Sequence, residues 1–306
     1  MRRKLLICAV LVVLVMALAG YFTKGVLSPK IGICLSSEDS ELEKNLRDEL
    51  VLAGYTVLSR NGENDQEKQN QQVRALLQKD VTVLVVQPVN AAAVTEILHM
   101  AVETPVIFIG QEPAELDNAY YVGCDAKEQG AVQAELLESL FNIADINNDK
   151  CVDYMTLSGP AEDGRAQLYL QNVAAAMAEY STQKLEEALC DGTSAAAKTL
   201  CRQAFSKYGR DLELILCSSD ALALGAIDAV ISSGRTPGED VIIFSIGTEA
   251  SCLETVGSGA LTAAVVEDTA TIRSRLVQVV NDLAKGKTVS QKNYVSYKIL
   301  IADKVS

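Results

Sequence analysis

The segment at residues 145–153, DINNDKCVD, carries potential oxygen ligands at alternate positions. A calcium loop of the EF-hand type takes oxygen ligands at positions 1, 3, 5, 7 and 9, has Gly at position 6 and ends with a Glu at position 12. The segment supplies the first five ligand positions, but Lys150 stands at position 6 and Thr156 at position 12. The spacing leaves two alternatives open, a metal-binding loop and a polar turn stabilised by Asp and Asn side chains.

Short runs rich in β-branched residues alternate with helical patterns along the rest of the chain. Strands that are each followed by a helix predict parallel sheets covered by helices on both faces. About ten strands and nine helices are too many for one ordinary doubly wound sheet, so the expected fold class is α/β with two Rossmann-like lobes. The segments expected to form strands are KIGICLS, YTVLSR, VTVLVVQPV, TPVIFIG, AYYVGCD, VDYMTLSG, LELILCSS, VIIFSIG, LTAAVVED and YVSYKILIAD.

Two helix starts can also be read from the sequence. Ser40 and Glu43 form a capping box, which predicts that a helix begins at Ser40. Ser219 precedes the helical pattern ALALGAIDAVISSG and is expected to be its N-cap. In open α/β sheets ligands bind beyond the carboxyl ends of the strands, where loops and helix N-termini meet. Helix capping by itself would explain both serines.

The composition restricts the class of partner. The chain has 306 residues, of which 49% are hydrophobic, and a formal net charge of -13. Binding of DNA or RNA needs clustered Lys and Arg, so a small neutral ligand or a cation is the more suitable partner. An enzyme is not expected either, because the sequence contains no G-x-S-x-G motif, no phosphate-binding G-x-x-x-x-G-K-[ST] loop and no Cys/His cluster with zinc spacing.

The first 29 residues predict export from the cytoplasm. A positively charged start is followed by an apolar run and by the sequence ALAG, which ends at Gly20 and is a plausible signal-peptidase site. The apolar run over residues 5–22 also has the length of about 17–25 residues that a membrane span needs. Cleavage and retention as an anchor are both open, and the expected location is extracytoplasmic, in the periplasm or on the outer face of the cytoplasmic membrane.

A set of segments occurs in a specific order and spacing: IGICLS, NGENDQEKQNQQVRALL, VLVVQPVNAAA, PVIFIGQEP, DNAYYVGCDAKEQG, the loop at 145–153, SSDALALGAIDAV and IIFSIGTEAS. In these segments the sequence resembles the type I periplasmic sugar-binding proteins, the galactose- and glucose-binding members in particular. The resemblance implies two Rossmann-like lobes, joined by a three-segment hinge, that close over a monosaccharide. The implied N-terminal lobe comprises residues 30–124 and 268–292, and the C-terminal lobe residues 125–267 and 293–306.

In that family the loop aligned with residues 145–153 is a calcium site, which a Glu from a distant strand completes. In this sequence Glu213, in LELILCSSD, falls at the matching position. The resemblance therefore implies one Ca²⁺ bound by Asp145, Asn147, Asp149, the Cys151 carbonyl, Asp153 and Glu213. Lys150 is expected to weaken the site, because it stands where Gly adopts a positive φ without strain.

The same resemblance implies a remodelled sugar pocket. Arg165 is the family residue that is clearly kept, whereas Gly247 replaces the principal Asp, and Leu42 and Cys190 stand where two stacking aromatic residues belong. The loss of these contacts implies a cleft that is no longer specific for glucose or galactose. Arg165 could accept a carboxylate or phosphate group of a different ligand. The candidate ligand-binding residues are Asp39, Ser40, Arg165, Ser219, Asp220 and Glu267.

Two functions follow from these expectations. The first is the solute-binding component of an ABC importer, which passes a sugar or sugar derivative to a membrane permease. The alternative is a membrane-anchored sensor that reports ligand binding to a receptor or histidine kinase, and an uncleaved helix at residues 5–22 would favour it. A transcription regulator with the same lobes needs a helix-turn-helix before the first strand, where this sequence is apolar, so that class is excluded.

Overall fold

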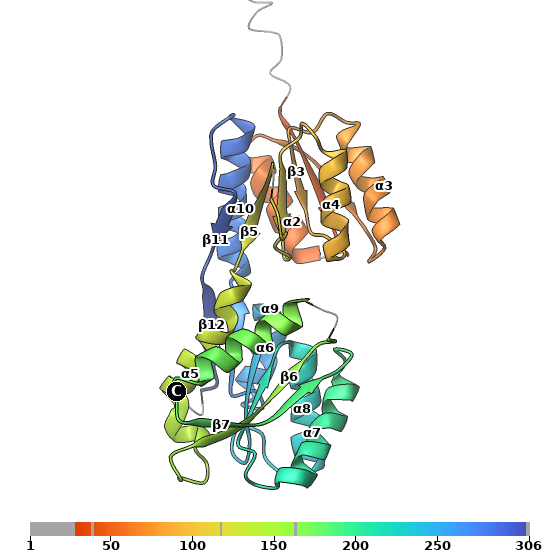
Figure 1. The fold of residues 1–306 in the computed structure, drawn as a ribbon. Helices are drawn as coiled ribbons and strands as arrows, with labels where there is room; N and C mark the ends of the chain where they lie inside the picture. The colour runs from red at the N-terminus through yellow and green to blue at the C-terminus, as the bar shows by residue number, and fades with distance from the viewer. Residues whose placement is uncertain (1–27, 38–39, 117, 162–163, 304–306) are drawn as a thin grey trace, which may run out of the picture. The chain divides into compact units, whose positions relative to one another are not determined.

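The computed structural model describes residues 28–37, 40–116, 118–161 and 164–303 (Figure 1). The predicted signal or anchor segment lies almost wholly outside these ranges. Within them, no helix combines the length and the apolar character that a membrane crossing requires. The side chains of residues 40, 41, 91, 92, 164, 165 and 248–250 also lie outside the description.

The chain divides into two compact units. Unit 1 comprises Met1–Phe108, Asp117–Ala119 and Val280–Val289, and unit 2 comprises Ile109–Leu116, Tyr120–Val279 and Ser290–Ser306. The structure contains two sheets made mainly of parallel strands, which confirms the predicted α/β fold class with two lobes. The lobe boundaries expected from the sequence remain a prediction.

The first sheet has the strand order β11-β5-β4-β3-β1-β2. Its pairs β1–β2, β1–β3, β3–β4 and β5–β11 are parallel. Strands β3 and β4 are buried along their whole length, which explains why they read as continuous apolar runs in the sequence. The elements that belong with this sheet are β1 (Lys30–Leu35), α2 (Ser40–Leu52), β2 (Thr56–Asn61), α3 (Gln66–Leu77), β3 (Val83–Val86), α4 (Ala91–Met100), β4 (Val106–Ile109), β5 (Ala119–Gly123), α10 (Thr269–Ala284) and β11 (Lys292–Tyr294).

Helix α3 shows how unit 1 uses a buried polar side chain. Gln69 is 0% exposed. Its amide nitrogen donates to the carbonyl of Gln87 at 2.8 Å, and its amide oxygen accepts from the backbone N–H of Val89 at 3.0 Å. Both partners lie in the loop after β3, so one side chain satisfies two buried backbone groups and fixes α3 against that loop.

The second sheet, in unit 2, has the strand order β12-β10-β9-β8-β6-β7. The pair β10–β12 is antiparallel, and the pairs β6–β7, β6–β8, β8–β9 and β9–β10 are parallel. The elements are the 3₁₀ helix η1 (Ala126–Glu128), α5 (Gln129–Ala144), β6 (Val152–Ser158), α6 (Gly164–Met177), β7 (Thr182–Leu189), α7 (Ser194–Tyr208), β8 (Leu214–Cys217), α8 (Asp220–Ser232), β9 (Ile242–Thr248), α9 (Glu249–Gly257), β10 (Ala263–Glu267) and β12 (Tyr297–Ile301).

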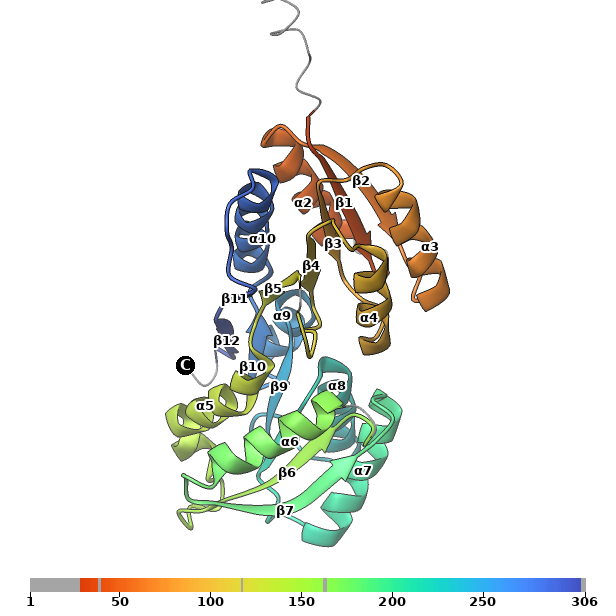
Figure 2. The same ribbon diagram turned by 45° about the horizontal axis from the view of Figure 1, so that its top comes forward.

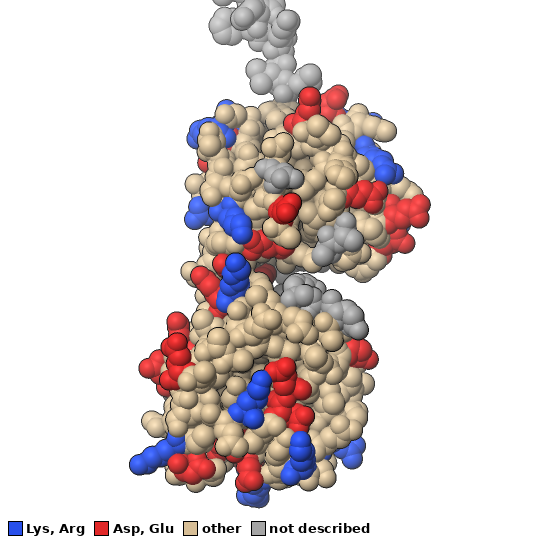
Figure 3. Space-filling model, in the orientation of Figure 1, with Lys and Arg blue, Asp and Glu red and all other residues tan. Residues whose placement is uncertain are grey.

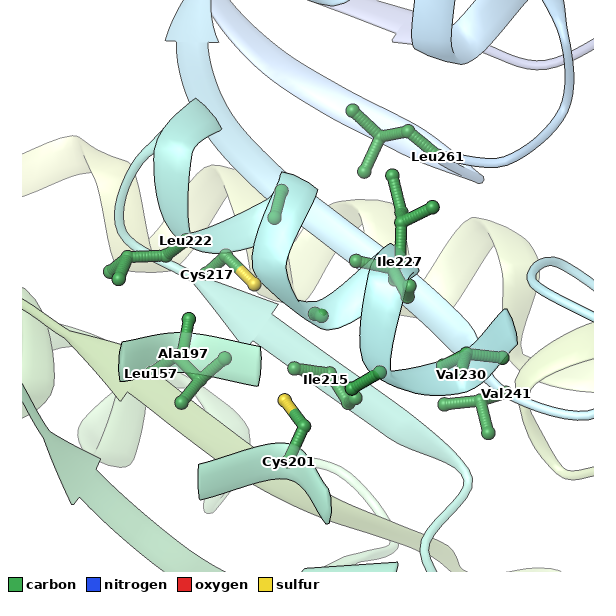
Figure 4. Close-up of a cluster of buried hydrophobic side chains, with 14 of the residues drawn as sticks. Leu157, Ala197, Cys201, Ile215, Cys217, Leu222, Ile227, Val230, Val241 and Leu261 are labelled. Atoms are coloured by element: carbon green, nitrogen blue, oxygen red, sulfur yellow. The ribbon is translucent and has the colours of Figure 1, made fainter. Parts of the chain in front are cut away.

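Helices cover both faces of this second sheet (Figure 2). Side chains of α5 and α6 form one buried cluster with Tyr154 of β6, and side chains of α7, α8 and α9 form another with Met155 and Leu157 of the same strand. Figure 4 shows part of the second cluster, in which Cys201 of α7 and Cys217 of β8 lie among Leu157, Ile215 and other apolar side chains. The thiols thus behave as small hydrophobic groups. Across the described residues the seven cysteines are free.

The structure corrects the predicted strands at two places. Strand β7 was not among them, because its sequence TQKLEEAL is polar, and the strand lies at the edge of the sheet with β6 as its neighbour. The segment YVSYKILIAD, predicted as one strand, is divided between β11 in the first sheet and β12 in the second. In both cases the position of the strand in its sheet, which the local pattern does not contain, decides the outcome.

Exposed charges of both signs are interspersed on the face of unit 2 that Figure 3 shows. Ion pairs of unit 2, such as Lys207–Glu186 at 3.0 Å and Lys184–Glu187 at 2.5 Å, join exposed side chains. Such pairs contribute little to stability.

Candidate ligand-binding site

A cavity of about 590 Å³ lies in unit 2, and all of the residues that line it belong to that unit. This volume is in the range of about 300–1,000 Å³ that small-molecule sites occupy. Its walls include residues that directly follow parallel strands, namely Cys124 after β5, Gly159 after β6 and Ser218 after β8, and the last residue of β10, Glu267. The cavity therefore lies at the carboxyl ends of strands, where ligand sites of α/β sheets are found.

Two of the six predicted ligand contacts line this cavity, Ser219 and Glu267. Asp220 follows Ser219 but is not among the lining residues. Asp39 lies outside the described residues, and the side chains of Ser40 and Arg165 do as well. Whether any of the six touches a ligand stays a prediction.

Ser219 is the N-cap of α8, as its position in the sequence predicts. Its hydroxyl oxygen accepts from the backbone N–H of Leu222 at 3.4 Å. A capping hydroxyl still has a proton to donate and a second lone pair to accept with. Ser219 can therefore bind a ligand group and keep its capping hydrogen bond with Leu222.

The carboxylate of Asp220 occupies the space beside Gly247. It accepts hydrogen bonds from the Cys252 thiol at 2.8 Å, from the Ser245 hydroxyl at 3.4 Å and from the Ser251 hydroxyl. A Cβ atom added to Gly247 would lie 1.7 Å from Oδ1 of Asp220. Position 247 is therefore a glycine because a neighbouring carboxylate fills the place of its side chain.

Three tyrosines, Tyr121, Tyr169 and Tyr297, line the same cavity and were not among the predicted site residues. The Tyr121 hydroxyl donates to the carbonyl of Cys124 at 3.1 Å, and the Tyr169 hydroxyl donates to Gln133 Oε1 at 2.9 Å. Aromatic rings are common in small-molecule pockets. Tyr121 and Tyr297 belong to the predicted strands AYYVGCD and YVSYKILIAD, so the signal was present, but only the fold shows which face of each strand meets the cavity.

Glu267 is an acid of the cavity wall whose carboxylate has no hydrogen bond or ion pair among the described residues. Burial raises the pKa of its carboxyl group. Burial first, and then the charge of Glu267, raise the pKa of Tyr121 and the pKa of Cys124, the latter to about 12. Tyr121 and Cys124, which line the cavity with Glu267, are therefore neutral at pH 7.

Glu112, also in the cavity wall, has a different environment. Lys292 lies 2.6 Å from Glu112 Oε1, and the Tyr294 hydroxyl donates to the same oxygen at 2.7 Å. The hydrogen bond with Glu112 is the main reason that the pKa of Lys292 is raised. Glu112 thus differs from Glu267, since Glu112 is paired within the protein.

The loop at residues 145–153, between α5 and β6, meets Glu213 in the structure. Glu213 is 0% exposed and directly precedes β8. Its Oε1 accepts from the backbone N–H of Asn147 at 2.8 Å, and its Oε2 accepts from that of Asp153 at 3.0 Å. The fold thus brings the distant acid to the loop, as the resemblance implied.

Lys150 has the backbone conformation that position 6 of such a loop requires. Its φ is 72°, in the left-handed region that a residue with a Cβ adopts only with strain. Asp145 supports this turn, since its two carboxylate oxygens accept from the backbone N–H groups of Asp149 at 3.1 Å and Lys150 at 3.0 Å.

The donor chemistry of the loop fits a hard cation. Four carboxylates gather there, and burial, Asp149 and Asp211 raise the pKa of Asp153, which is the kind of repulsion that a divalent cation offsets. In the structure, several carboxylate oxygens of the loop and of Glu213 accept hydrogen bonds from backbone N–H groups. Among the described residues, no group of three or more His, Cys, Asp and Glu side chains is arranged to hold a metal ion. The calcium site therefore stays a prediction.

Comparison with known proteins decides the family. Residues 33–288 match the family described as periplasmic binding protein domain. The chain belongs to this family. The resemblance to type I periplasmic sugar-binding proteins, drawn from the sequence segments, is thereby confirmed.

Named relatives of this periplasmic binding protein share its length as well as its sequence. It is 27% identical, over 281 residues that cover 86% of this chain and 83% of the relative, to the D-galactose/methyl-galactoside binding periplasmic protein MglB of Haemophilus influenzae. It is 21% identical, with 85% and 83% coverage, to the ribose import binding protein RbsB of Bacillus subtilis.

Solved structures share the fold. An ABC transporter solute-binding protein from Bacillus halodurans with bound myo-inositol is similar with a TM-score of 0.75 and 20% identity, covering 92% of this chain and 98% of that one. A periplasmic ribose ABC transporter structure from Conexibacter woesei has a TM-score of 0.78 and 15% identity, with 91% and 93% coverage. At these identities the likeness is one of fold.

Proposed function

We propose that this protein is an extracytoplasmic solute-binding protein that captures a monosaccharide-like ligand and delivers it to an ABC permease. The observation that carries the proposal is the cavity of unit 2, which combines three tyrosine rings with the polar groups of Ser219 and Glu267 at the carboxyl ends of strands. Rings pack on the apolar faces of a sugar while polar groups bind its hydroxyls. The names of the relatives, which refer to galactose, ribose and myo-inositol, support this ligand class.

Position 247 and its surroundings differ from what the resemblance implies for tight glucose or galactose binding. Gly247 carries no side chain, and the neighbouring Asp220 carboxylate accepts hydrogen bonds from Ser245, Ser251 and Cys252. A carboxylate used in this way has less capacity left for sugar hydroxyls. The ligand is therefore a sugar derivative other than the two parent hexoses, and the protein acts on it by binding, without chemistry.

Titration calorimetry of the purified protein against hexoses, pentoses, inositols and sugar acids tests this function. The expected result is saturable binding of at least one probe, accompanied by a higher melting temperature, because a ligand that binds only the native state stabilises it by mass action. If no probe binds and none changes the melting temperature, the proposal fails. Tight binding of glucose or galactose would contradict the remodelled cavity.

The membrane-anchored sensor depends on residues 5–22, which lie outside the described residues. Sequencing the N-terminus of the mature protein distinguishes the two forms. A mature chain that begins near Gly20 supports the soluble importer component, whereas an intact start at Met1 in the membrane fraction supports the anchored form.

We also propose that the loop at residues 145–153, with Glu213, binds one structural Ca²⁺. Oxygen donors of this number and charge are typical of calcium sites. Excess Ca²⁺ should raise the melting temperature above that in a chelator, and Glu213→Ala should abolish the difference. The exposed Glu239→Gln serves as a matched control that keeps the calcium response. An equal melting temperature of the wild type with Ca²⁺ and with chelator refutes the calcium proposal.

A further inference from the structure

Glu267 ends β10 and lines the cavity of unit 2. It is paired in register with Tyr297 of β12 on one side and with Thr248 of β9 on the other. Its side chain is half-buried. Among the hydrogen bonds and ion pairs between described residues, none involves its carboxylate, and burial is the one cause that raises its pKa.

Among the described residues of unit 2, no cation offsets the burial that raises the pKa of Glu267. Tyr121, Cys124 and Tyr297 are the groups on which its charge acts. The Tyr121 hydroxyl donates to the carbonyl of Cys124 and so is engaged elsewhere. The described groups on which the charge of Glu267 acts are thus neutral.

The cations of the cavity wall are also engaged or exposed. Lys292 forms an ion pair with Glu112 at 2.6 Å, and Lys127 is exposed. Counting the described lining residues, three acids (Glu112, Asp125 and Glu267) face two lysines. Among these described residues, one negative charge therefore lacks a counterpart.

A partly buried carboxylate without a partner is unfavourable, because burial removes water from a charged group. A ligand can relieve this cost with a hydroxyl or with an ammonium group. The hydrogen bond from an ammonium is charge-assisted and about twice as strong as a neutral one. Tyr121 and Tyr297 also line this cavity, and aromatic faces attract cations.

We propose that Glu267 is a specificity-determining residue that selects a ligand with a protonated amino group, so that the cavity takes an aminated monosaccharide or polyol in preference to the neutral parent compound. This inference rests on the proposed function, because it names the ligand class of the same cavity. It also places the amino group of the bound ligand next to Glu267 and leaves Ser219 for a hydroxyl.

Calorimetry at neutral pH tests the inference with matched sets of three probes. Each set contains a neutral sugar or inositol, its amino derivative and its N-acetyl derivative, for example D-glucose, D-glucosamine and N-acetyl-D-glucosamine, with the amino group at different ring positions in different sets. At least one amino compound should bind about tenfold or more tighter than its neutral parent and its N-acetyl form, as a charge-assisted hydrogen bond predicts.

Variants at Glu267 assign the preference to this residue. Glu267→Gln should lose about tenfold or more of the affinity for the amino compound, and Glu267→Asp, which keeps the charge, should retain a preference for it. The exposed Glu239→Gln should leave all affinities unchanged. Melting temperatures of the variants show that each is folded.

The outcomes separate this inference from the function on which it rests. If neutral sugars bind as tightly as their amino derivatives, or if Glu267→Gln keeps the preference, the inference is wrong and the proposed function stands. Stronger binding of sugar acids would also overturn it, in favour of an anionic ligand. If no probe of any kind binds, both proposals fail.

Discussion

Replacing Gly247 by Ala puts a methyl group where the Asp220 carboxylate lies. The added Cβ would be 1.7 Å from Oδ1 and 2.2 Å from Cγ of Asp220, far closer than non-bonded atoms allow. The Asp220 side chain must therefore leave its position, and its hydrogen bonds with Ser245, Ser251 and Cys252 are lost or lengthened.

The magnitude follows from two contributions. Inserting a methyl group into a packed site costs about 1–3 kcal/mol. A hydrogen bond to a charged group contributes about 1.5–3 kcal/mol when buried, and less here because Asp220 is only half-buried. We expect Gly247→Ala to lower the free energy of unfolding by about 2–3 kcal/mol, which corresponds to a fall in melting temperature of about 4–12 °C for a unit of this size.

A double-mutant cycle isolates the clash. The four proteins are the wild type, Gly247→Ala, Asp220→Ala and the double variant, compared by urea titration followed by circular dichroism, with equal m-values as the check on two-state unfolding. Asp220→Ala removes the atoms that collide with the new methyl group. In that background Gly247→Ala should cost less than about 0.5 kcal/mol, which gives a coupling energy well above the additive limit.

Equal costs of Gly247→Ala in the two backgrounds would refute this reasoning. In that case something other than the Asp220 carboxylate would require a glycine at position 247, and the explanation given for this residue would be wrong.

Three further predictions concern other parts of the chain. Gln69→Ala should lower the free energy of unfolding by about 2–3 kcal/mol, because the Gln87 carbonyl and the Val89 N–H lose their partner. As a control, Gln71→Ala at an exposed position of the same helix should change it by less than about 0.5 kcal/mol. Equal effects would contradict the role of Gln69 in joining α3 to the loop after β3. Lys150→Gly should raise it by up to about 1 kcal/mol by releasing a strained φ, as measured by urea titration in chelator, and a loss of stability would show that the strain is absent. The raised pKa of Glu267 means that the folded protein holds this proton more tightly than the unfolded chain, so a stabilisation present below pH 4.5 is lost as the pH rises through the raised value. Ligand-free Glu267→Gln should therefore gain stability relative to the wild type between about pH 4 and pH 7, and a constant difference would exclude an uncompensated carboxylate.

Much of the fold could be predicted from the sequence because the pattern is locally encoded. Strands such as β3 and β4 are buried on both faces and so appear as uninterrupted apolar runs. Ser219 caps α8 through a bond that spans three residues. Strand β7 could not be found in this way, because an edge strand with an exposed face needs no apolar pattern, and its pairing with β6 stabilises it.

The sequence by itself determined the family, through the order of its segments, and it placed Glu213 as a partner of the loop at residues 145–153. Only the tertiary structure decided the character of the candidate site. It put the Asp220 carboxylate in the space of a side chain at Gly247, brought the rings of three tyrosines to one cavity and gave the Glu267 carboxylate no hydrogen bond or ion pair among the described residues. These properties depend on distances between residues that are remote in the chain, and no local pattern of residue types contains such distances.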